Sequence, residues 1–486
     1  MSFWTLDRVA EALGSSGMTE SGAAVARGTV GDATEIGAAG TARAIDGTGA
    51  VRTSVAAGKA PPGNVSTDTR SLKAGDVFVA LRGDRFDGHE FLDAAVSSGA
   101  GALVVDSAEA ASVYSVPVFV VADTLLALAD LARYRRRAWG GVVVAIAGSN
   151  GKTTTKDLTR AALEVGHRVH ATSGNFNNRI GVPQTLLALP NDATVAVVEV
   201  GTNLPGEIAI LRDICEPNVA VITSIGEEHL EGLKDLEGVL REEIEIARGV
   251  PLLIAPSAHP EVARAAASLA GRIVVAGLDE GDLHADSWSV DADGRGVLVV
   301  NGVEVRPVVR GRHNLRNTML ALAVAREFEI SMEQAAAGIS SMPLPNMRVS
   351  WQIHGRLTLI NDAYNANPPS VRAALDLLEG ADGERQRVAV LGSMLELGDE
   401  SSRLHDEIVG IALSGKADVV AAVGLMADAV QRVAAADERV VTAGDVEELW
   451  PRLAERLEPD AVVLLKGSRG ARLERLVPHL TAWAAE

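Results

Sequence analysis

The sequence predicts an α/β protein of three domains: a small N-terminal α/β domain, a central doubly wound sheet of the P-loop type, and a C-terminal Rossmann-like sheet. The chain has 486 residues, more than one hydrophobic core usually organises. Short apolar runs alternate with helical patterns, and the central runs are continuously apolar, which is typical of parallel strands covered on both faces. Two prolines in MPLPN, residues 342–346, break the chain between the last two domains and indicate a hinge.

The first domain is predicted to span residues 1–138. From residue 65 onward, VSTDTR, DVFVAL, ALVVD and VPVFVV are expected strands, with a helix around residues 92–98. Residues 20–60 are rich in glycine, alanine and threonine and show little periodicity. We therefore expect a poorly ordered insertion there, and we assign it no function.

The central domain is predicted over residues 139–343 and the C-terminal domain over residues 344–486. Expected central strands are GVVVAIAG, TVAVVEVG, NVAVITSIG, VPLLIAP and RIVVAG, and the helix NLRNTMLALAVAREF closes this domain. In the last domain RLTLINDAY, RVAVLGS, ADVVAAVG and DAVVLLKGS are each followed by a helical pattern.

Composition excludes several classes of protein. A net charge of -19 argues against a nucleic-acid or anionic-membrane partner, because a phosphate backbone requires a basic face. The single cysteine, Cys215, permits neither an internal disulfide nor a cysteine metal cluster. The start MSFWTLDRVAEALG lacks a signal pattern, and no apolar run approaches the length of a membrane span. We expect a cytoplasmic monomer.

A glycine-rich turn follows the strand GVVVAIAG and precedes a helix, so backbone N–H groups and the helix dipole converge on an anion there. Lys152 supplies a charge for the β and γ phosphates of ATP, and the Thr153 hydroxyl is suited to Mg²⁺. Position 146 is isoleucine where the full motif has glycine, which leaves open a plain strand-to-helix turn. The residues predicted to bind the nucleotide here are Gly148, Ser149, Asn150, Gly151, Lys152, Thr153 and Thr154.

Further polar residues follow the ends of expected strands. Glu199 ends TVAVVEVG, where ligands of open α/β sheets collect, and either binds Mg²⁺ or forms an ordinary cap or ion pair. His229 follows the next strand, where a lone histidine is usually structural. Asn175 and Asn178 lie in a polar loop that turn chemistry alone also explains.

The shortened loop GSNGKTTT resembles that of the Mur ligases, ATP-dependent enzymes that build the peptide stem of peptidoglycan precursors. Four later segments resemble the family in the same order, and DAYNANP has the form of its MurF branch. The resemblance covers nearly the whole chain except residues 20–60. The four segments are GNFNNRIGVP, ITSIGEEHLEG, GRHNLRN and DAYNANP.

The resemblance implies specific roles in ATP and metal binding. It implies that Asn314 and Asn317 lie against the adenine and that Arg348 reaches the ATP phosphates. One departure concerns a second metal, because Arg241 stands where many relatives carry a carbamylated lysine, and arginine cannot serve as a carbamate. Either the second metal is held otherwise, for example by the neighbouring Glu242 or Glu243, or the site is weaker. The implied catalytic residues are Lys152, Asn175, His229 and Arg348, the implied metal ligands are Thr153, Glu199 and His229, and Asp362 joins the ATP site.

The resemblance also implies where the other substrates bind. Cations of the first domain suit the diphosphate of a UDP-sugar, and the DAYNANP segment faces ATP and the incoming amine. Lys466, Ser468 and Arg469 are suited to a carboxylate, although a solvated loop explains them as well. The implied substrate-binding residues are Ser66, Asp68, Arg70, Arg82, Arg85, Asn178, Tyr364, Asn365 and Asn367.

The implied reaction joins D-alanyl-D-alanine to UDP-N-acetylmuramoyl-tripeptide through an acyl phosphate, with ATP and Mg²⁺. Another Mur-type or folylpolyglutamate-type ligase is the nearest alternative, and the DAYNANP segment disfavours it. A regulatory ATPase of the P-loop class is a rival of another kind. It would hydrolyse ATP without an amine acceptor.

Overall fold

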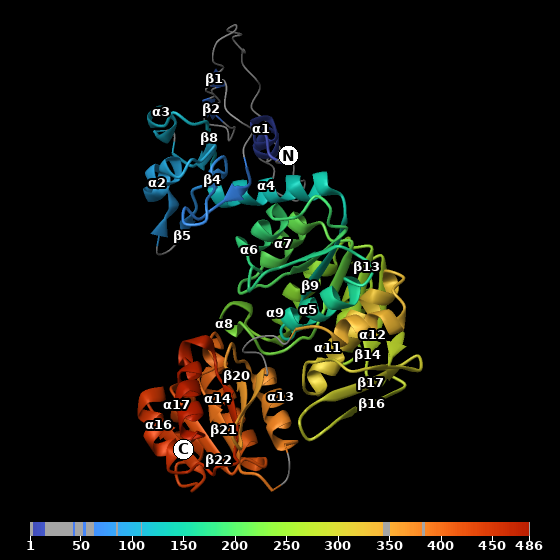
Figure 1. Ribbon diagram of the computed structural model, residues 1–486, viewed down its shortest axis with the longest axis vertical. Helices are drawn as coiled ribbons and strands as arrows, with labels where there is room; N and C mark the ends of the chain where they lie inside the picture. Colours follow the sequence, from blue (N-terminus) through green and yellow to red (C-terminus); the bar gives the residue numbers. More distant parts are fainter. Residues whose placement is uncertain are drawn as a thin grey trace. The chain divides into compact units, whose positions relative to one another are not determined.

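A computed structural model describes residues 3–14, 42–43, 52–54, 63–83, 86–107, 109–343, 350–381 and 384–485. The predicted α/β class is confirmed, and three large sheets are built from successive parts of the chain (Figure 1). The chain divides into two compact units, described separately below: one draws on positions 1–141, 176–191 and 213–216, and the other on the remaining positions. The three domain boundaries from the sequence stay a prediction.

The first unit contains a sheet of strand order β1-β2-β8-β7-β4-β3. The first two strands in this order, β1 at the edge and β2 beside it, lie within the range 20–60, and β2 pairs antiparallel with β8. The expectation of a poorly ordered insertion over residues 20–60 stays a prediction. The rest of that range lies outside the described residues. The strands are β1 Ala42–Arg43, β2 Arg52–Ser54, β3 Val65–Ser66, β4 Val77–Val79, β7 Ala102–Val105 and β8 Val118–Val120.

Helices and a short hairpin complete this unit. Asp123 caps α4, since its carboxylate accepts from the N–H groups of Leu125 and Leu126 at 2.7 and 3.0 Å. Near the other end of α4, Arg136 donates to the carbonyl of Cys215 at 2.9 Å. The remaining elements are α1 Leu6–Gly14, β5 Arg82–Gly83, β6 Phe86–Asp87, α2 Leu92–Ser97, α3 Ala110–Val113, α4 Thr124–Trp139 and α6 Gly181–Leu187.

The second unit begins with a seven-stranded parallel sheet of order β10-β11-β9-β12-β13-β14-β15. The five predicted central strands are all present, and the short outer strands β10 and β15 were missed. Because every strand is parallel, all carboxyl ends meet at one edge. The strands are β9 Val142–Ala147, β10 Val169–Ala171, β11 Val195–Glu199, β12 Val219–Ile222, β13 Leu252–Pro256, β14 Arg272–Gly277 and β15 Leu283–His284.

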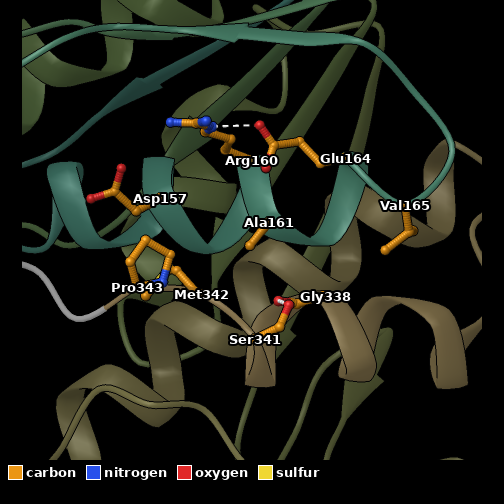
Figure 2. Close-up of a pocket in the computed structure, with 9 residues that line it drawn as sticks. All are labelled: Asp157, Arg160, Ala161, Glu164, Val165, Gly338, Ser341, Met342 and Pro343. Atoms are coloured by element: carbon orange, nitrogen blue, oxygen red, sulfur yellow. Dashed lines mark hydrogen bonds and ion pairs between the residues drawn. The ribbon is translucent and has the colours of Figure 1, made fainter.

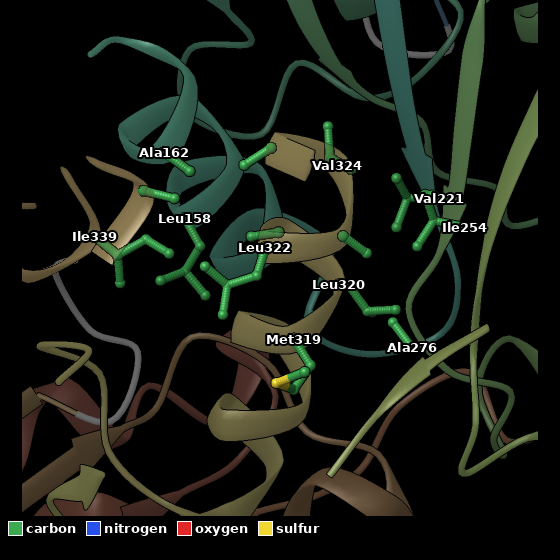
Figure 3. Close-up of a cluster of buried hydrophobic side chains, with 14 of the residues drawn as sticks. Leu158, Ala162, Val221, Ile254, Ala276, Met319, Leu320, Leu322, Val324 and Ile339 are labelled. Atoms are coloured by element: carbon green, nitrogen blue, oxygen red, sulfur yellow. The ribbon is translucent and has the colours of Figure 1, made fainter. Parts of the chain in front are cut away.

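A buried hydrophobic cluster fixes the helix that follows the glycine-rich turn (Figure 3). Leu158 of that helix, α5, packs with Leu322 of α11 and Ile339 of α12. Close packing of this kind leaves little room for the helix to shift. The packing of α5 against α11 and α12 therefore also holds the residues of its first turn in place. The helices of this layer are α5 Lys152–Leu163, α7 Glu207–Cys215, α8 Leu230–Leu233, α9 Leu236–Glu243, α10 Pro260–Ala266, α11 Arg312–Glu327 and α12 Met332–Ser340.

Two further sheets lie in the second unit. A three-stranded antiparallel sheet joins β15 to α11, and the sequence did not predict it. The last sheet has order β19-β20-β24-β21-β22-β23, in which only β19 is antiparallel. Four of its strands were predicted. The antiparallel sheet contains β16 Ser287–Val290, β17 Gly296–Val300 and β18 Val303–Val305. The last sheet contains β19 Ser350–His354, β20 Leu357–Asp362, β21 Arg387–Leu391, β22 Val419–Val423, β23 Val440–Ala443 and β24 Val462–Lys466.

Helices alternate with the strands of the last sheet, as doubly wound topology requires. They are α13 Pro368–Glu379, α14 Ser401–Ser414, α15 Leu425–Val433, α16 Val446–Ala454 and α17 Leu476–Trp483. Within the described ranges, none of the helices combines the length and the apolar character that crossing a membrane requires.

Candidate active site

The turn between β9 and α5 is braced by the segment that follows the neighbouring strand β12. The Ser149 N–H donates to the carbonyl of Ser224 at 2.9 Å, and the Gly226 N–H donates to Ser149 Oγ at 2.9 Å. The Asn150 N–H donates to Ser224 Oγ at 3.0 Å. The turn therefore lies at the carboxyl edge of the sheet, at the N-terminus of α5, as an anion site requires.

Two glycines of this turn have left-handed backbones that other residues rarely adopt, with φ of 113° at Gly148 and 83° at Gly151. A Cβ atom at Gly148 would lie 2.4 Å from Thr223 Oγ1. A Cβ atom at Gly151 would lie 2.7 Å from both Nδ2 and Oδ1 of Asn317. Glycine is thus required at both positions by the protein's own packing, before any ligand is considered.

Replacing Gly151 with alanine is expected to raise the KM for ATP about tenfold, because the new methyl group displaces Asn317 and strains the turn. Steady-state kinetics at varied ATP measures this. Gly302→Ala is the matched control, since Gly302 also has a left-handed backbone, with φ of 77°, but nothing lies within 4 Å of its Cβ position. Equal KM values in the two variants would contradict the assignment.

Lys152 lies at the start of α5 and folds back over the turn. Its Nζ donates to the carbonyls of Gly148 and Ser149 at 2.6 and 3.2 Å. The same nitrogen is 3.7 Å from Glu228 Oε1. A triphosphate bound in this turn would offer the ammonium stronger, charged partners than two carbonyls.

Thr153 and Glu199 meet at the carboxyl edge of the sheet, where Thr153 Oγ1 donates to Glu199 Oε2 at 2.7 Å. Both are buried, and Glu199 is only 1% exposed. The backbone N–H of Glu199 donates to Thr172 Oγ1, which holds the end of β11. A hydroxyl and a carboxylate are oxygen ligands of the kind that Mg²⁺ prefers, so this pair fits the ion implied by the sequence.

Two further carboxylates lie next to the turn, and no role was predicted for one of them, Glu228. Glu228 and Glu243 are 5% and 0% exposed, and Oε1 of each accepts no hydrogen bond from a described residue. Glu243 Oε2 accepts from the Gly148 N–H at 2.7 Å. Burial raises the pKa of Glu228 to about 8 and that of Glu243 to about 7, against the opposing effect of Lys152.

Arg241 and its neighbours Glu242 and Glu243, the two possible substitutes for a metal ligand that the sequence left open, have three different surroundings in the structure. Arg241 is exposed and pairs with Glu237 at 2.8 Å. Glu242 accepts from the N–H groups of Gly206 and Ile208 at 2.7 and 2.8 Å, so its carboxylate caps the start of α7. Of the three neighbours only Glu243 faces the phosphate turn. Positions 239, 242 and 243 share one face of a helix, which is a signal that both glutamates are buried but does not distinguish Glu243 from Glu242.

Replacing Glu243 with glutamine is expected to make stability less dependent on pH. The carboxyl pKa is near 4.5 in the unfolded chain and about 7 in the folded one, so the folded state holds the extra proton between these values. The contribution of Glu243 to stability therefore falls as pH rises through this window, by about 3 kcal/mol in all, and levels off above it.

Urea unfolding of the ligand-free protein at pH 5 and pH 8 measures this effect. The stability difference between the two pH values should shrink in Glu243→Gln and stay unchanged in Glu237→Gln, which alters an exposed glutamate of the same helix. A difference as large in Glu243→Gln as in the parent chain would rule the assignment out.

His229 precedes α8 with a left-handed backbone, φ 50° and ψ 32°. Its Nδ1 makes a short hydrogen bond with Glu396, and its Nε2 lies 3.8 Å from Glu228 Oε2. Burial and the charge of Lys152 lower the pKa of His229. Among the described residues, no group of three or more His, Cys, Asp or Glu side chains is placed to hold a metal ion. The metal-binding role of His229 stays a prediction.

The two asparagines of α11 form a hydrogen bond with each other. Asn317 Nδ2 donates to Asn314 Oδ1 at 3.0 Å, and Asn314 Nδ2 donates to the Arg310 carbonyl at 2.7 Å. Both are buried, and Asn317 packs on Gly151. Asn175 is exposed in a turn between β10 and α6. Asn178, in the first unit, accepts from the Gly181 N–H at 2.9 Å, which confirms the turn chemistry.

In the last sheet, Asp362 and Lys466 end adjacent strands and form an ion pair of 2.6 Å. Lys466 Nζ also donates to the Asn365 carbonyl at 2.8 Å, so this buried ammonium already has partners within its own domain.

The other candidates of this domain also have local partners. Asn367 caps α13, because its side chain accepts from the Ser370 N–H at 3.0 Å, and Asn365 is exposed. Ser468 is buried and donates to the Ala366 carbonyl, and the Arg469 guanidinium lies 5.8 Å from the Tyr364 ring centre.

The first-unit candidates are already paired with acids. Arg70 binds Asp68 at 2.6 Å but its side chain is 88% exposed, and the Ser66 hydroxyl donates to the Asp68 carbonyl. Arg82 pairs with Asp106 at 2.8 Å and with Asp87. Their role in diphosphate binding stays a prediction. Two predicted residues, Arg85 and Arg348, lie outside the described residues.

A cavity of about 370 Å³ lies between α5 and the end of α12 and contains none of the predicted site residues (Figure 2). Arg160 and Glu164 in its wall bind each other at 2.6 Å, and Asp157 pairs with Lys156 at 2.9 Å. The nine lining residues are Asp157, Arg160, Ala161, Glu164, Val165, Gly338, Ser341, Met342 and Pro343.

Comparisons with known proteins agree across both units. Residues 63–136 match the model of the Mur ligase family, catalytic domain; residues 146–325 match the Mur ligase middle domain; and residues 347–469 match the Mur ligase, glutamate ligase domain. The UDP-N-acetylmuramoyl-tripeptide--D-alanyl-D-alanine ligase of Bacillus subtilis is 35% identical over 86% of this chain and 92% of its own length. The Escherichia coli enzyme of the same name is 34% identical over 86% and 93%.

Solved structures give the same result. A crystal structure of MurF from Acinetobacter baumannii has a TM-score of 0.79 and 31% identity, covering 86% of this chain and 93% of its own. A MurF ligase from Thermotoga maritima in complex with ADP has a TM-score of 0.78 and 27% identity, covering 87% and 98%.

Proposed function

Because the chain belongs to the Mur ligase family, we propose that it is the ATP-dependent ligase that joins D-alanyl-D-alanine to UDP-N-acetylmuramoyl-tripeptide. Curated relatives with this name match over most of the chain. The structural observation that carries the proposal is the hydrogen bond from Thr153 to Glu199 beside the glycine-rich turn. This bond supports the proposal because it brings oxygen atoms suited to a cation next to a turn suited to phosphate, at one edge of the sheet.

In this reaction the tripeptide carboxylate attacks the γ phosphorus of ATP, ADP leaves, and the amine of D-alanyl-D-alanine displaces phosphate from the acyl phosphate. Carboxylate and triphosphate repel each other, so the protein must neutralise negative charge along the transfer. Lys152 would exchange the Gly148 and Ser149 carbonyls for phosphate oxygens. By family resemblance, Arg348 would add a second cation.

Mg²⁺, when bound, would neutralise part of the phosphate charge, and Thr153 and Glu199 are the residues that would hold it. We propose this site because a buried hydroxyl and a buried carboxylate converge beside the phosphate turn. Asn314 and Asn317 are proposed for the adenine, and the first unit for the UDP-sugar. The cytoplasmic location and the monomeric state expected from the sequence stay predictions.

Phosphate release from ATP tests the proposal, with UDP-N-acetylmuramoyl-tripeptide and D-alanyl-D-alanine each omitted in turn. We expect steady release only when both are present, and a UDP-pentapeptide product by mass spectrometry. A regulatory ATPase would release phosphate without either substrate. Phosphate release at the same rate with and without D-alanyl-D-alanine would contradict the proposed ligase function.

A further inference from the structure

The side chains of His229 and Glu396 contact each other, and both residues have a backbone conformation that is rare outside glycine. Each has a left-handed conformation, φ 50° at His229 and φ 62° at Glu396, which costs energy for any residue but glycine. Such conformations persist only where surrounding structure imposes them, and they cluster at functional sites. Here the two side chains meet in a short hydrogen bond between His229 Nδ1 and the Glu396 carboxylate.

Backbone contacts hold the two segments together independently of these side chains. The Glu231 N–H donates to the Glu396 carbonyl at 3.2 Å. At Gly398, which has a left-handed backbone with φ of 54°, a Cβ atom would lie 3.1 Å from Glu231 Cα, so the two segments approach closely here. On the other side, the Leu233 N–H donates to the His229 carbonyl at 2.8 Å and fixes the start of α8. The histidine and its carboxylate partner are thus aligned by main chain.

We propose that Glu396 is a positioning residue for His229: its carboxylate accepts the Nδ1–H proton and thereby leaves the Nε2 lone pair facing the phosphate turn. Nε2 lies on the side of Glu228, whose carboxylate also contacts Lys152. Histidines that bind a cation usually donate their other ring N–H to such a carboxylate, which fixes the tautomer and the ring orientation.

This inference rests on the proposed function and assigns a new residue to it. Glu396 follows β21 in the last sheet, whereas His229 follows β12 in the central sheet. A group from one sheet therefore orients a predicted metal ligand of another. The consequence is that cation binding near the phosphates should depend on a residue that touches neither the nucleotide turn nor the Thr153–Glu199 pair.

Two measurements that need no turnover test this. The first is the ring ¹⁵N spectrum of the full-length protein labelled at its ten histidines, with His229→Gln used to identify the signals of His229. The second is the binding of Mn²⁺, followed by electron paramagnetic resonance, to the enzyme saturated with a non-hydrolysable ATP analogue. The variants are Glu396→Ala and Glu396→Gln. Glu400→Ala is the control, because Glu400 lies in the same segment but pairs with Arg403 at 2.6 Å.

We expect the Nδ1–H tautomer of His229 in the parent chain, and Mn²⁺ affinity about 10- to 100-fold lower in Glu396→Ala than in Glu400→Ala. Glu396→Gln keeps a hydrogen-bond acceptor, so it should preserve the tautomer and lose less affinity than Glu396→Ala. An Nε2–H or doubly protonated ring in the parent chain would overturn the inference. So would equal Mn²⁺ affinity in Glu396→Ala and Glu400→Ala. If the parent chain had no ligase activity, the proposed function would be overturned. The His229 tautomer and the Mn²⁺ affinity could still be measured in that case.

Discussion

Replacing Lys152 with methionine is expected to lower kcat for phosphate release at least about 1,000-fold, which corresponds to about 4 kcal/mol of lost transition-state stabilisation. Methionine keeps an unbranched apolar side chain, one atom shorter than that of lysine, but removes the charge. The Nζ of Lys152 is the ammonium that lies over the turn, bonded to the Gly148 and Ser149 carbonyls. Negative charge on the transferred phosphoryl group would then lose its nearest protein cation.

The measurement is single-turnover formation of ADP with saturating ATP and both other substrates, which separates chemistry from binding. Lys416→Met is the control, because Lys416 is an exposed lysine between α14 and β22. It should retain activity within about twofold of the parent chain. Activity of Lys152→Met within tenfold of that control would show that the phosphates bind elsewhere.

Much of the second unit could be predicted from sequence, because its strands are continuous apolar runs between helical patterns. β9, β11 and β12 all lie where GVVVAIAG, TVAVVEVG and NVAVITSIG predicted them. Parallel strands bring their carboxyl ends to one edge, so the meeting of Thr153 and Glu199 followed from topology. The outer strands β10 and β15 of the central sheet were missed, because two or three residues at a sheet edge carry no usable periodicity.

The parts of the site that were missed depend on packing between distant segments. Glu228 stands beside Glu227 in the sequence, where a pair of acids normally indicates a solvated surface, yet it is 5% exposed. Its burial follows from the Ser149 and Gly226 contacts that fold the segment under the turn. Likewise, nothing within the sequence links His229 to Glu396, which is 167 positions away.

Replacing Glu199 with glutamine is expected to reduce kcat about 1,000-fold and to raise the Mg²⁺ concentration needed for half-maximal rate. Glutamine has the same size and its carbonyl oxygen can still accept from Thr153 Oγ1, so the buried hydrogen bond of 2.7 Å is retained. What is lost is the negative charge on a side chain only 1% exposed. A cation at this position would then face the hydroxyl and a neutral amide, which bind Mg²⁺ weakly.

Rates at Mg²⁺ concentrations from micromolar to tens of millimolar measure this, with thermal unfolding to confirm that the variant is folded. Glu164→Gln provides the comparison: it makes the same chemical change at the other end of α5, where Glu164 is paired with Arg160 on the surface. That variant should keep the parent rate and Mg²⁺ dependence. If Glu199→Gln also kept both, Glu199 would serve only to hold Thr153, and the cation would have to be bound by other oxygen atoms around the turn.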